Sequence, residues 1–331
     1  MSGHFPRSAP LSCTALALAA LLSAAAYASP ESPGSPLGAV LEAAIGHGGS
    51  GTAAAARSPA STPKGYSAFV PKPLREERRL SWEPKAVPEI VPGVYEFDYR
   101  RMDFRRRLVM TIDDCAPNEN MARELDILAE RGIQAVFFIV GAYFLEPDGQ
   151  PKSASRALLR RAIEEGHELG SHGFDHSRLD QGPYRDDYAR IADNLERNQA
   201  ALDLCLGYHY PIRYVRPPNG AHWTPRYMVD AYLRDRGQFL INWNTTPGDW
   251  CMNYPPGDPQ WMSAKTVVEV GLSSARRTRG GVLLYHGFPK SAEIMDEVLD
   301  ALLDPPDGGL PFRFVPLREV LYDKYLNGLY K

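Results

Sequence analysis

The sequence predicts an α/β fold built on parallel strands, and three observations lead to this prediction. The 331 residues have a globular composition, with 44% hydrophobic and 23% charged side chains, which suits one large domain or two small ones. From Arg107 onward, short apolar runs alternate with helix-length segments, as in strand–helix–strand units around a parallel sheet. Polar residues directly follow several runs, and both open α/β sheets and barrels place functional groups at such strand ends.

The expected elements follow from the apolar runs and from helix-end signals. Strands are expected at residues 108–112, 135–140, 214–215, 239–243, 282–285 and 312–315. Helices are expected at residues 119–131, 154–165, 184–206, 264–277 and 293–303. Gly132 and Gly166 are typical helix ends, because glycine adopts the left-handed conformation readily. Thr224 and Pro225 indicate the start of a further helix, as N-cap and first helical residue.

The first 28 residues are expected to be a cleavable signal peptide. Arg7 precedes an apolar run at residues 15–26, which ends in the small-x-small pattern Ala26-Tyr27-Ala28. A membrane anchor is the alternative, but the run is shorter than the roughly 20 residues that a spanning helix needs. We therefore expect export to the periplasm or the extracellular space, without stable membrane insertion after cleavage.

Two further segments precede the domain expected at residues 105–331. Residues 29–64 are rich in Pro, Ser, Gly and Ala, which predicts a disordered linker. Residues 65–104 combine prolines and charges with Trp82 and Tyr95, and we expect them to form an extended N-terminal arm.

Charge and cysteine content exclude some classes of protein. Removing residues 1–28 takes away one arginine and no acid, which leaves 36 basic and 40 acidic side chains. The sequence contains no block of basic residues of the kind that binds nucleic acid or an anionic membrane. Three cysteines remain, Cys115, Cys205 and Cys251, and an odd number allows at most one internal disulfide.

The first expected strand runs into two adjacent carboxylates, Asp113 and Asp114. Neighbouring side chains on a regular strand point to opposite faces, so both can reach one site only where the backbone turns. Pro117 and Asn118 mark such a turn. The alternative is that the acids cap the helix that follows.

Two histidines, His172 and His176, lie four residues apart. If the backbone turns helically between them, their rings share one face and both can bind a metal ion. Surface or capping histidines are the alternative. Two histidines and one aspartate would leave open coordination positions for water and substrate.

Three later strand ends also carry polar residues. Arg216 follows one strand and can pair with a carboxylate, although a surface arginine in a proline-rich loop is the alternative. Asp249 and Trp250 follow the next strand, and His286 ends the one after it. A histidine in that position suits a general acid, and a capping histidine is the alternative.

The order of these motifs resembles the NodB-homology polysaccharide deacetylases, carbohydrate esterase family 4. The motifs are TIDDC at 111–115, SHGFDH at 171–176, RPPNG at 216–220, NTTPGDW at 244–250 and LLYHG at 283–287. The resemblance covers about residues 105–325 and implies a distorted (β/α) barrel with parallel strands. It implies hydrolytic N-deacetylation of an N-acetylated glycan such as peptidoglycan, a chitin-type oligomer or an exopolysaccharide.

The resemblance also implies roles for ten residues. Asp113 would be the catalytic base and Arg216 would orient it, while Asp249 would tune His286, the general acid. One divalent metal ion, Zn²⁺ with Co²⁺ or Ni²⁺ as alternatives, would activate the attacking water. Its implied ligands are Asp114, His172 and His176. The implied substrate-binding residues are Asn219, through a backbone N–H near it, and Trp250 and Leu284 around the acetyl methyl.

The sequence departs from the family pattern at four positions. Ile112 and Cys115 replace the usual Phe and Gly, Asn219 replaces an aromatic residue, and Thr246 replaces an Asp that is often present. None of these departures removes a metal ligand, the base or the acid, so they are expected to affect the choice of substrate more than the activity. Since Cys115 and Cys251 each adjoin a catalytic motif, one hypothesis is that they form a disulfide, and two separate buried thiols are the alternative.

Two other functions fit the same residues. One is an amidohydrolase that acts on a non-sugar C–N bond, which the export signal disfavours. The other is a non-catalytic glycan-binding module, which the presence of Asp113 and of all three metal ligands disfavours.

Overall fold

The computed structural model describes residues 104–221 and 227–326. The expected signal peptide, the linker and nearly all of the expected arm lie outside these residues. The helix start expected at Thr224 and Pro225 also lies outside them.

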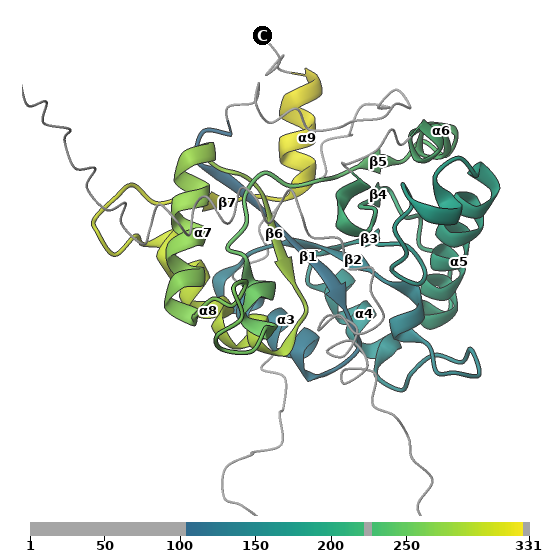
Figure 1. Cartoon of the computed structure of the whole chain (residues 1–331), viewed down its shortest axis with the longest axis horizontal. Helices are drawn as coiled ribbons and strands as arrows, with labels where there is room; N and C mark the ends of the chain where they lie inside the picture. The colour runs from purple at the N-terminus through teal and green to yellow at the C-terminus, as the bar shows by residue number, and fades with distance from the viewer. Residues whose placement is uncertain (1–103, 222–226, 327–331) are drawn as a thin grey trace, which may run out of the picture.

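Within the described residues, seven parallel strands form one curled sheet (Figure 1). The strands are β1 (Arg107–Cys115), β2 (Ala135–Ile139), β3 (Glu168–Ser171), β4 (Tyr214–Val215), β5 (Phe239–Leu240), β6 (Gly281–His286) and β7 (Arg313–Phe314). Their order is β5-β4-β3-β2-β1-β6, and β7 pairs with β1. The strands are all parallel, so their carboxyl ends meet at one edge of the sheet.

The chain after β5 returns to the opposite edge of the sheet and closes it into a distorted barrel. Ile241 donates its N–H to Val215 in β4, and three residues later Asn244 donates to Val282 in β6. Thr245 then forms a parallel bridge with Leu283. This crossing explains why β5 has only two residues, whereas the apolar run predicted a strand at 239–243.

Side chains alternate between the two faces of the sheet along each strand, so the hydrophobic core consists of an inner and an outer cluster. The inner cluster contains Val109, Val136, Phe138, Tyr214 and Val282, together with Leu317, Val320 and Leu321 of α9 (Leu317–Leu326). The outer cluster joins the other strand positions to the surrounding helices. Because Thr111 and Asp113 alternate in step with Val109, the inner face continues from an apolar core into the polar end of the barrel.

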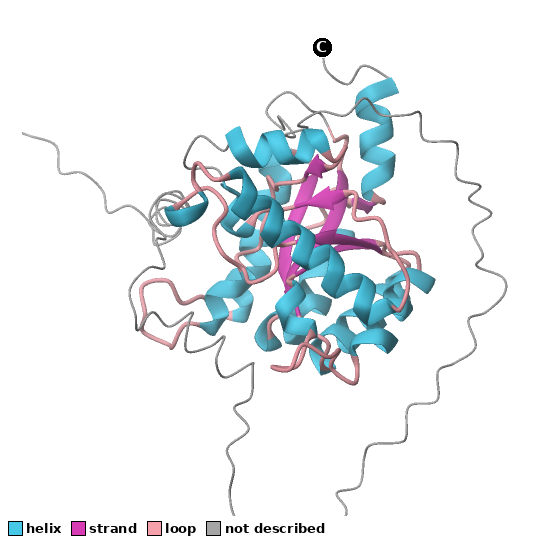
Figure 2. Cartoon of the chain, turned by 90° about the vertical axis from the view of Figure 1, so that its right-hand side faces the viewer, coloured by secondary structure: helices cyan, strands magenta, loops and turns pink. Residues whose placement is uncertain are grey.

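Helices enclose the sheet (Figure 2). They are α3 (Glu119–Arg131), α4 (Ser155–Glu164), α5 (Tyr188–Leu206), α6 (Tyr227–Asp235), α7 (Ala264–Thr278), α8 (Pro289–Leu303) and α9. The described part of the chain also contains the short 3₁₀ turns η2 (Gly141–Phe144), η3 (Gly182–Tyr184), η4 (Pro218–Ala221) and η5 (Asp249–Asn253). The ends of α3 agree with prediction, since Asn118 caps its first N–H groups and Gly132 adopts the left-handed conformation.

Several other elements also differ from the sequence-based expectation, and α9 was not expected at all. β3 has the sequence ELGS, which contains a glycine and two polar residues and therefore has no apolar run. α5 begins at Tyr188 because Asp187 caps it. α8 begins at Pro289, a residue that suits a first helical position.

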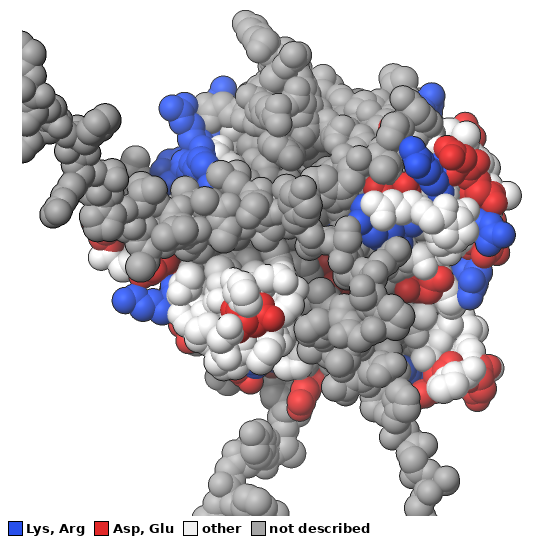
Figure 3. Space-filling model, in the orientation of Figure 1, with Lys and Arg blue, Asp and Glu red and all other residues white. Residues whose placement is uncertain are grey.

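The visible surface mixes charges of both signs. Figure 3 shows basic and acidic side chains side by side over α5 and α6, where Arg190 pairs with Asp187 and Arg236 with Glu196. Within residues 104–221 and 227–326, no helix has the length and apolar character that a membrane span needs.

Candidate active site at the carboxyl ends of the strands

Both carboxylates at the end of β1 reach the same histidine. The Nε2 atom of His172 lies 3.6 Å from Oδ2 of Asp113 and 3.8 Å from Oδ1 of Asp114. Asp114 has φ +58°, and the pairing of β1 with β2 shifts register between Ile112 and Cys115. Aspartate tolerates the left-handed conformation better than most residues. This irregularity, rather than a strand end at Ile112, brings the two adjacent acids together.

Asp113 forms a buried ion pair with Arg216. Nη1 of Arg216 donates to Oδ1 of Asp113 at 2.7 Å and to Oγ1 of Thr111 at 2.9 Å. Its Nε donates to the carbonyl of Ile241 at 2.8 Å, and its guanidinium lies 4.3 Å from the Phe138 ring centroid. Burial raises the pKa of Asp113 and outweighs the opposing effect of Arg216. Arg216 is thus fully buried and holds one oxygen of the Asp113 carboxylate in place. The alternative, a surface arginine in a proline-rich loop, is wrong.

His172 and His176 converge without a helix. Residues 172–176 contain a bend and no helix, and His176 has φ +60°, so the helical turn that was the condition for their sharing one face is not present. The ring centroids nevertheless lie 5.1 Å apart. The two rings are brought together by the irregular path of the chain through Gly173, which also has a positive φ, and not by the spacing of a helix.

Asp114, His172 and His176 form a candidate metal centre. One donor atom from each lies within 4.8 Å of the other two. His172 Nδ1 lies 2.6 Å from the carbonyl of Arg216, an interaction that requires a proton on Nδ1 and leaves Nε2 with a free lone pair. Burial lowers the pKa of His172 to about 3, so the ring is neutral, as a metal ligand must be.

The donor set fits a divalent metal ion in a further respect. Oδ1 of Asp114 is buried and accepts no hydrogen bond from the described residues, although Nε2 of His176 lies 3.1 Å away. A buried carboxylate oxygen without a donor is costly. Two imidazoles and one carboxylate form a ligand set typical of zinc and related ions.

His286 faces this group from the neighbouring strand. It pairs in register with Asp113 across β6 and β1. Asp249 accepts the His286 backbone N–H at 2.9 Å, and its oxygens lie 3.2 and 3.3 Å from Nδ1. Burial favours the neutral ring, but Asp249, aided by Asp114 and Asp113, raises the pKa of His286 to about 9. The imidazole is therefore a cation at neutral pH.

Aromatic rings hold His286 in place. Phe288 stacks on it with a centroid separation of 5.3 Å, and Trp250 meets it edge-on at 5.2 Å. Leu284 is buried two residues earlier in β6 and therefore shares the inner face with His286. Asn219 lies in η4 with φ +57°, three residues after Arg216, and among the described residues no hydrogen bond is seen between its side chain and the other predicted residues.

Sequence reasoning missed three residues that lie at this site. Thr111 receives a hydrogen bond from Arg216, and its place in the alternation with Asp113 could have revealed it. Tyr143 lies in η2, beyond the strand end at Ile139, and its hydroxyl is buried. Burial and then Asp114 raise the pKa of Tyr143. Phe288 follows the LLYHG motif directly and carried no signal of its own.

The proposed disulfide between Cys115 and Cys251 is wrong. Both cysteines are buried and free, as is Cys205. The thiol of Cys115 lies 3.7 Å from the carbonyl oxygen of Ile112, so it turns back along its own strand. Burial raises the pKa of Cys251 to about 12 and that of Cys115 well above its usual value, so both thiols are protonated and unreactive.

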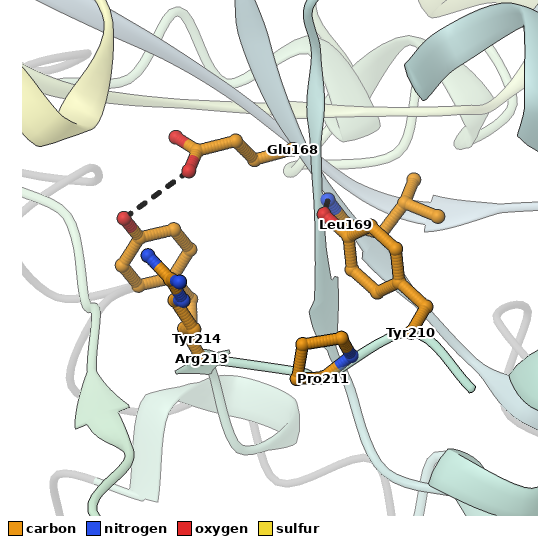
Figure 4. Close-up of a pocket in the computed structure, with 6 residues that line it drawn as sticks. All are labelled: Glu168, Leu169, Tyr210, Pro211, Arg213 and Tyr214. Carbon is orange, nitrogen blue, oxygen red and sulfur yellow. Dashed lines mark hydrogen bonds between the residues drawn. The ribbon is translucent and has the colours of Figure 1, made fainter. Parts of the chain in front are cut away.

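A separate pocket lies at the opposite end of the barrel, near the amino ends of β3 and β4 (Figure 4). Its lining residues are Glu168, Leu169, Tyr210, Pro211, Arg213 and Tyr214. Tyr214 hydrogen-bonds to Glu168 at 3.3 Å, and Tyr210 accepts the Leu169 N–H at 3.1 Å. These polar groups satisfy one another, and none of the candidate catalytic residues lines this pocket.

Comparison with known proteins agrees with the site. A family model described as polysaccharide deacetylase matches residues 102–233. The chain is 28% identical over 224 residues to the peptidoglycan-N-acetylglucosamine deacetylase PgdA of Listeria monocytogenes, an alignment covering 67% of this chain and 40% of that protein. The chain therefore spans less than half the length of this relative.

Two further proteins extend the comparison. The chitooligosaccharide deacetylase of Sinorhizobium fredii is 30% identical over 178 residues, which are 54% of this chain and 70% of that protein. A carbohydrate esterase of family 4 from Streptococcus mutans has a TM-score of 0.53 and 25% identity, with 67% of this chain and 92% of that one covered. The matches in sequence and fold agree with the five motifs and with the barrel, and the chain belongs to the polysaccharide deacetylase family.

Proposed function

We propose that this chain is a metal-dependent N-deacetylase of an N-acetylated glycan. One observation carries the proposal: donor atoms of Asp114, His172 and His176 converge, Nε2 of His172 lies 3.6 Å from the buried Asp113, and His286 pairs in register with Asp113 on the neighbouring strand. Hydrolysis of an acetamide needs these three functions together, because water must be activated, the carbonyl polarised and the amine protonated.

The roles of the residues follow from their contacts. A divalent cation held by Asp114, His172 and His176 would lower the pKa of a water molecule and polarise the acetamide carbonyl. Asp113 accepts the proton of the attacking water, and Arg216 fixes the carboxylate for this transfer. His286 donates its proton to the leaving nitrogen, since its pKa of about 9 keeps it protonated at neutral pH.

Three residues are proposed to bind the acetyl group. Trp250 and Leu284 adjoin His286 and would enclose the methyl group. A backbone N–H near Asn219, in a turn that follows Arg216, would stabilise the oxyanion that develops during attack.

The names of the relatives suggest the substrate class. They include deacetylases of peptidoglycan and of chitooligosaccharides. We propose a polymer or oligomer of N-acetylated sugar as substrate, zinc as the metal with cobalt or nickel as substitutes, and export through the segment at residues 1–28.

The test is release of acetate from N-acetylglucosamine oligomers and from peptidoglycan by the full chain. We expect activity that a chelator abolishes and that Zn²⁺ or Co²⁺ restores. Asp113→Asn keeps the shape of the side chain but not its basicity, and we expect a loss of about 100-fold or more in kcat. A surface change such as Glu269→Gln in α7 is the matched control.

Other outcomes would identify the alternatives. Turnover of a non-sugar amide without acetate release from glycans would indicate an amidohydrolase. Glycan binding without any turnover in the metal-loaded chain would indicate a binding module. Full activity of Asp113→Asn would contradict the assigned base.

A further inference from the structure

The segment that carries the two proposed histidine ligands has no regular secondary structure of its own. Residues 172–176 follow β3 and contain a bend, and both Gly173 and His176 have a positive φ. In a helix, the spacing of four residues would by itself place His172 and His176 on one face. Without a helix, the two rings stay within reach of one ion only if other elements hold the segment.

Asn194 of α5 uses both ends of its side-chain amide on this segment. Its Oδ1 accepts the backbone N–H of Phe174 at 2.8 Å, and its Nδ2 donates to Oδ1 of Asp175 at 2.8 Å. Nδ2 also donates to the hydroxyl of Tyr184 in η3 at 3.3 Å. These partners determine which end of the amide is the oxygen and which is the nitrogen. Asn194 is only 1% exposed, so water does not compete for its hydrogen bonds.

Asn198, one turn further along α5, binds the start of the same segment. Its Nδ2 donates to the carbonyl of Ile139 at 2.7 Å and also to the carbonyl of Gly173. From η2, the backbone N–H of Ala142 donates to the carbonyl of Phe174 at 2.8 Å. Side chains of α5 and the backbone of η2 therefore hold consecutive peptide groups between the two histidines.

The contact with Asn194 leaves no room for a side chain at Gly173. A Cβ atom there would lie 2.9 Å from Oδ1 of Asn194, and φ +76° is a conformation that favours glycine. To admit a side chain, Asn194 would have to move and lose its hydrogen bonds to Phe174 and Asp175. The conformation of the segment is thus tied to the position of this asparagine.

We propose that Asn194 is a positioning residue for the metal centre, which fixes the segment between His172 and His176 in its metal-binding conformation before an ion binds. Its hydrogen bonds within the described part of the chain go to Phe174, Asp175 and Tyr184, so it acts through the backbone of the segment and not on the ion. A segment that is already ordered loses less conformational entropy on binding, which raises the affinity. The inference rests on the proposed function in taking the two histidines as metal ligands.

Titration of the full chain with Zn²⁺ in a calorimeter tests the effect on affinity. Asn194→Leu nearly keeps the shape of the side chain but removes its hydrogen bonds to Phe174 and Asp175. We expect the Kd for Zn²⁺ to rise by about 10- to 100-fold, as is typical when a group that orients metal ligands is lost. An unchanged Kd overturns the positioning role.

Gln199 of the same helix offers a matched control. Its Oε1 accepts the N–H of Ile212 at 3.2 Å, and its Nε2 donates to the carbonyl of Tyr210 at 2.7 Å. It therefore binds α5 to the loop before β4, which adjoins the pocket of Figure 4 at the opposite end of the barrel. Gln199→Met should lower the melting temperature as Asn194→Leu does, but should change the zinc Kd by less than about 2-fold, because a loss of global stability leaves the affinity of the native state unaltered. Equal Kd values in the two variants overturn the proposal, since a merely structural role predicts them.

Hydrogen exchange in the metal-free wild type tests whether the segment is ordered before an ion binds. We expect the amide proton of Phe174 to exchange at least about 100-fold more slowly than in an unstructured peptide, because it is bonded to a buried side chain. In Asn194→Leu this protection should disappear while that of the α5 amides persists. Exchange of Phe174 at the unstructured rate in the wild type overturns the proposal, whether or not the leucine variant folds.

The two proposals fail separately, because the zinc titration and the amide exchange use no glycan. A chain whose zinc affinity depends on Asn194 but which releases no acetate would contradict the proposed function alone. A chain that releases acetate, and binds Zn²⁺ equally well in Asn194→Leu, would contradict this inference alone.

Discussion

At the scale of single residues, the end of β1 separates two adjacent carboxylates into different environments. Asp113 pairs with Arg216 inside the barrel, whereas Asp114 faces His176 with an oxygen that accepts no hydrogen bond from the described residues. Like charges on neighbouring residues are tolerated because each faces a different partner, Arg216 for Asp113 and His176 for Asp114. The same principle explains His286, which Asp249 holds as a cation.

Asp249→Asn should move the alkaline limit of the reaction to a lower pH. The raised pKa of His286 keeps this proposed general acid protonated up to about pH 9, and we expect activity to fall as the pH rises through that value. Without the carboxylate, the pKa should fall to its ordinary value of about 6.5 or below, which lowers kcat at pH 8 by about 30-fold. The pH profile of acetate release measures this shift. A profile identical to that of the wild type would remove His286 from the role of acid.

The buried ion pair makes a separate prediction about stability. Arg216→Met leaves Asp113 buried without its partner and should lower the free energy of unfolding by about 3–5 kcal/mol. In the double variant with Asp113→Asn no charge is left unpaired, so most of this loss should be recovered. Denaturant unfolding of both single variants and the double variant measures the coupling. Strictly additive losses would show that the two side chains do not interact.

At the scale of elements, the ends of β1 and β6 approach closely enough to require a glycine. A Cβ atom at Gly287 would lie 3.0 Å from Cα of Cys115 and 3.3 Å from the carbonyl oxygen of Asp114. The backbone N–H of Gly287 also donates to the carbonyl of Asp113 at 2.8 Å. The position of Asp114, the proposed metal ligand, therefore depends on the absence of a side chain at Gly287 in the neighbouring segment.

Gly287→Ala should push the end of β1 out of place. We expect a stability loss of about 1–3 kcal/mol from overpacking, together with weaker binding of Zn²⁺ in calorimetry. Gly132→Ala is the control, because φ +63° strains the alanine while no other atom lies within 4 Å. It should cost about 1 kcal/mol of stability without a change in zinc affinity. Equal zinc affinity in both variants would contradict the link between Gly287 and Asp114.

At the scale of the whole molecule, the barrel gathers residues that are distant in the sequence. Asp114 and the two histidines are about sixty residues apart, and His286 lies more than one hundred residues further on. All of them reach the carboxyl end of a single parallel sheet. A ligand that bridges β1 and the segment after β3 should therefore stabilise the fold as a whole.

Metal should raise the melting temperature of the full chain. A ligand bound only by the native state, at a free concentration 100 times its Kd, stabilises that state by about 2.7 kcal/mol. We expect this increase with Zn²⁺, its reversal by a chelator, and its absence in Asp114→Asn, which keeps the left-handed backbone but loses the charge. Equal zinc-induced shifts in wild type and variant would place the bound ion elsewhere.

The sequence by itself determined the alternation of strands and helices, the ends of α3 and the five motifs, because each depends on periodicity or capping within a few residues. It could not reveal that residues 172–176 bend rather than form a helix, or that β1 continues through a register shift, since backbone irregularity depends on neighbouring strands. Tertiary structure decided the closure of the barrel through Thr245, the free state of Cys115 and Cys251, and the place of Tyr143. Each of these results from packing between residues far apart in the chain, which no local pattern encodes.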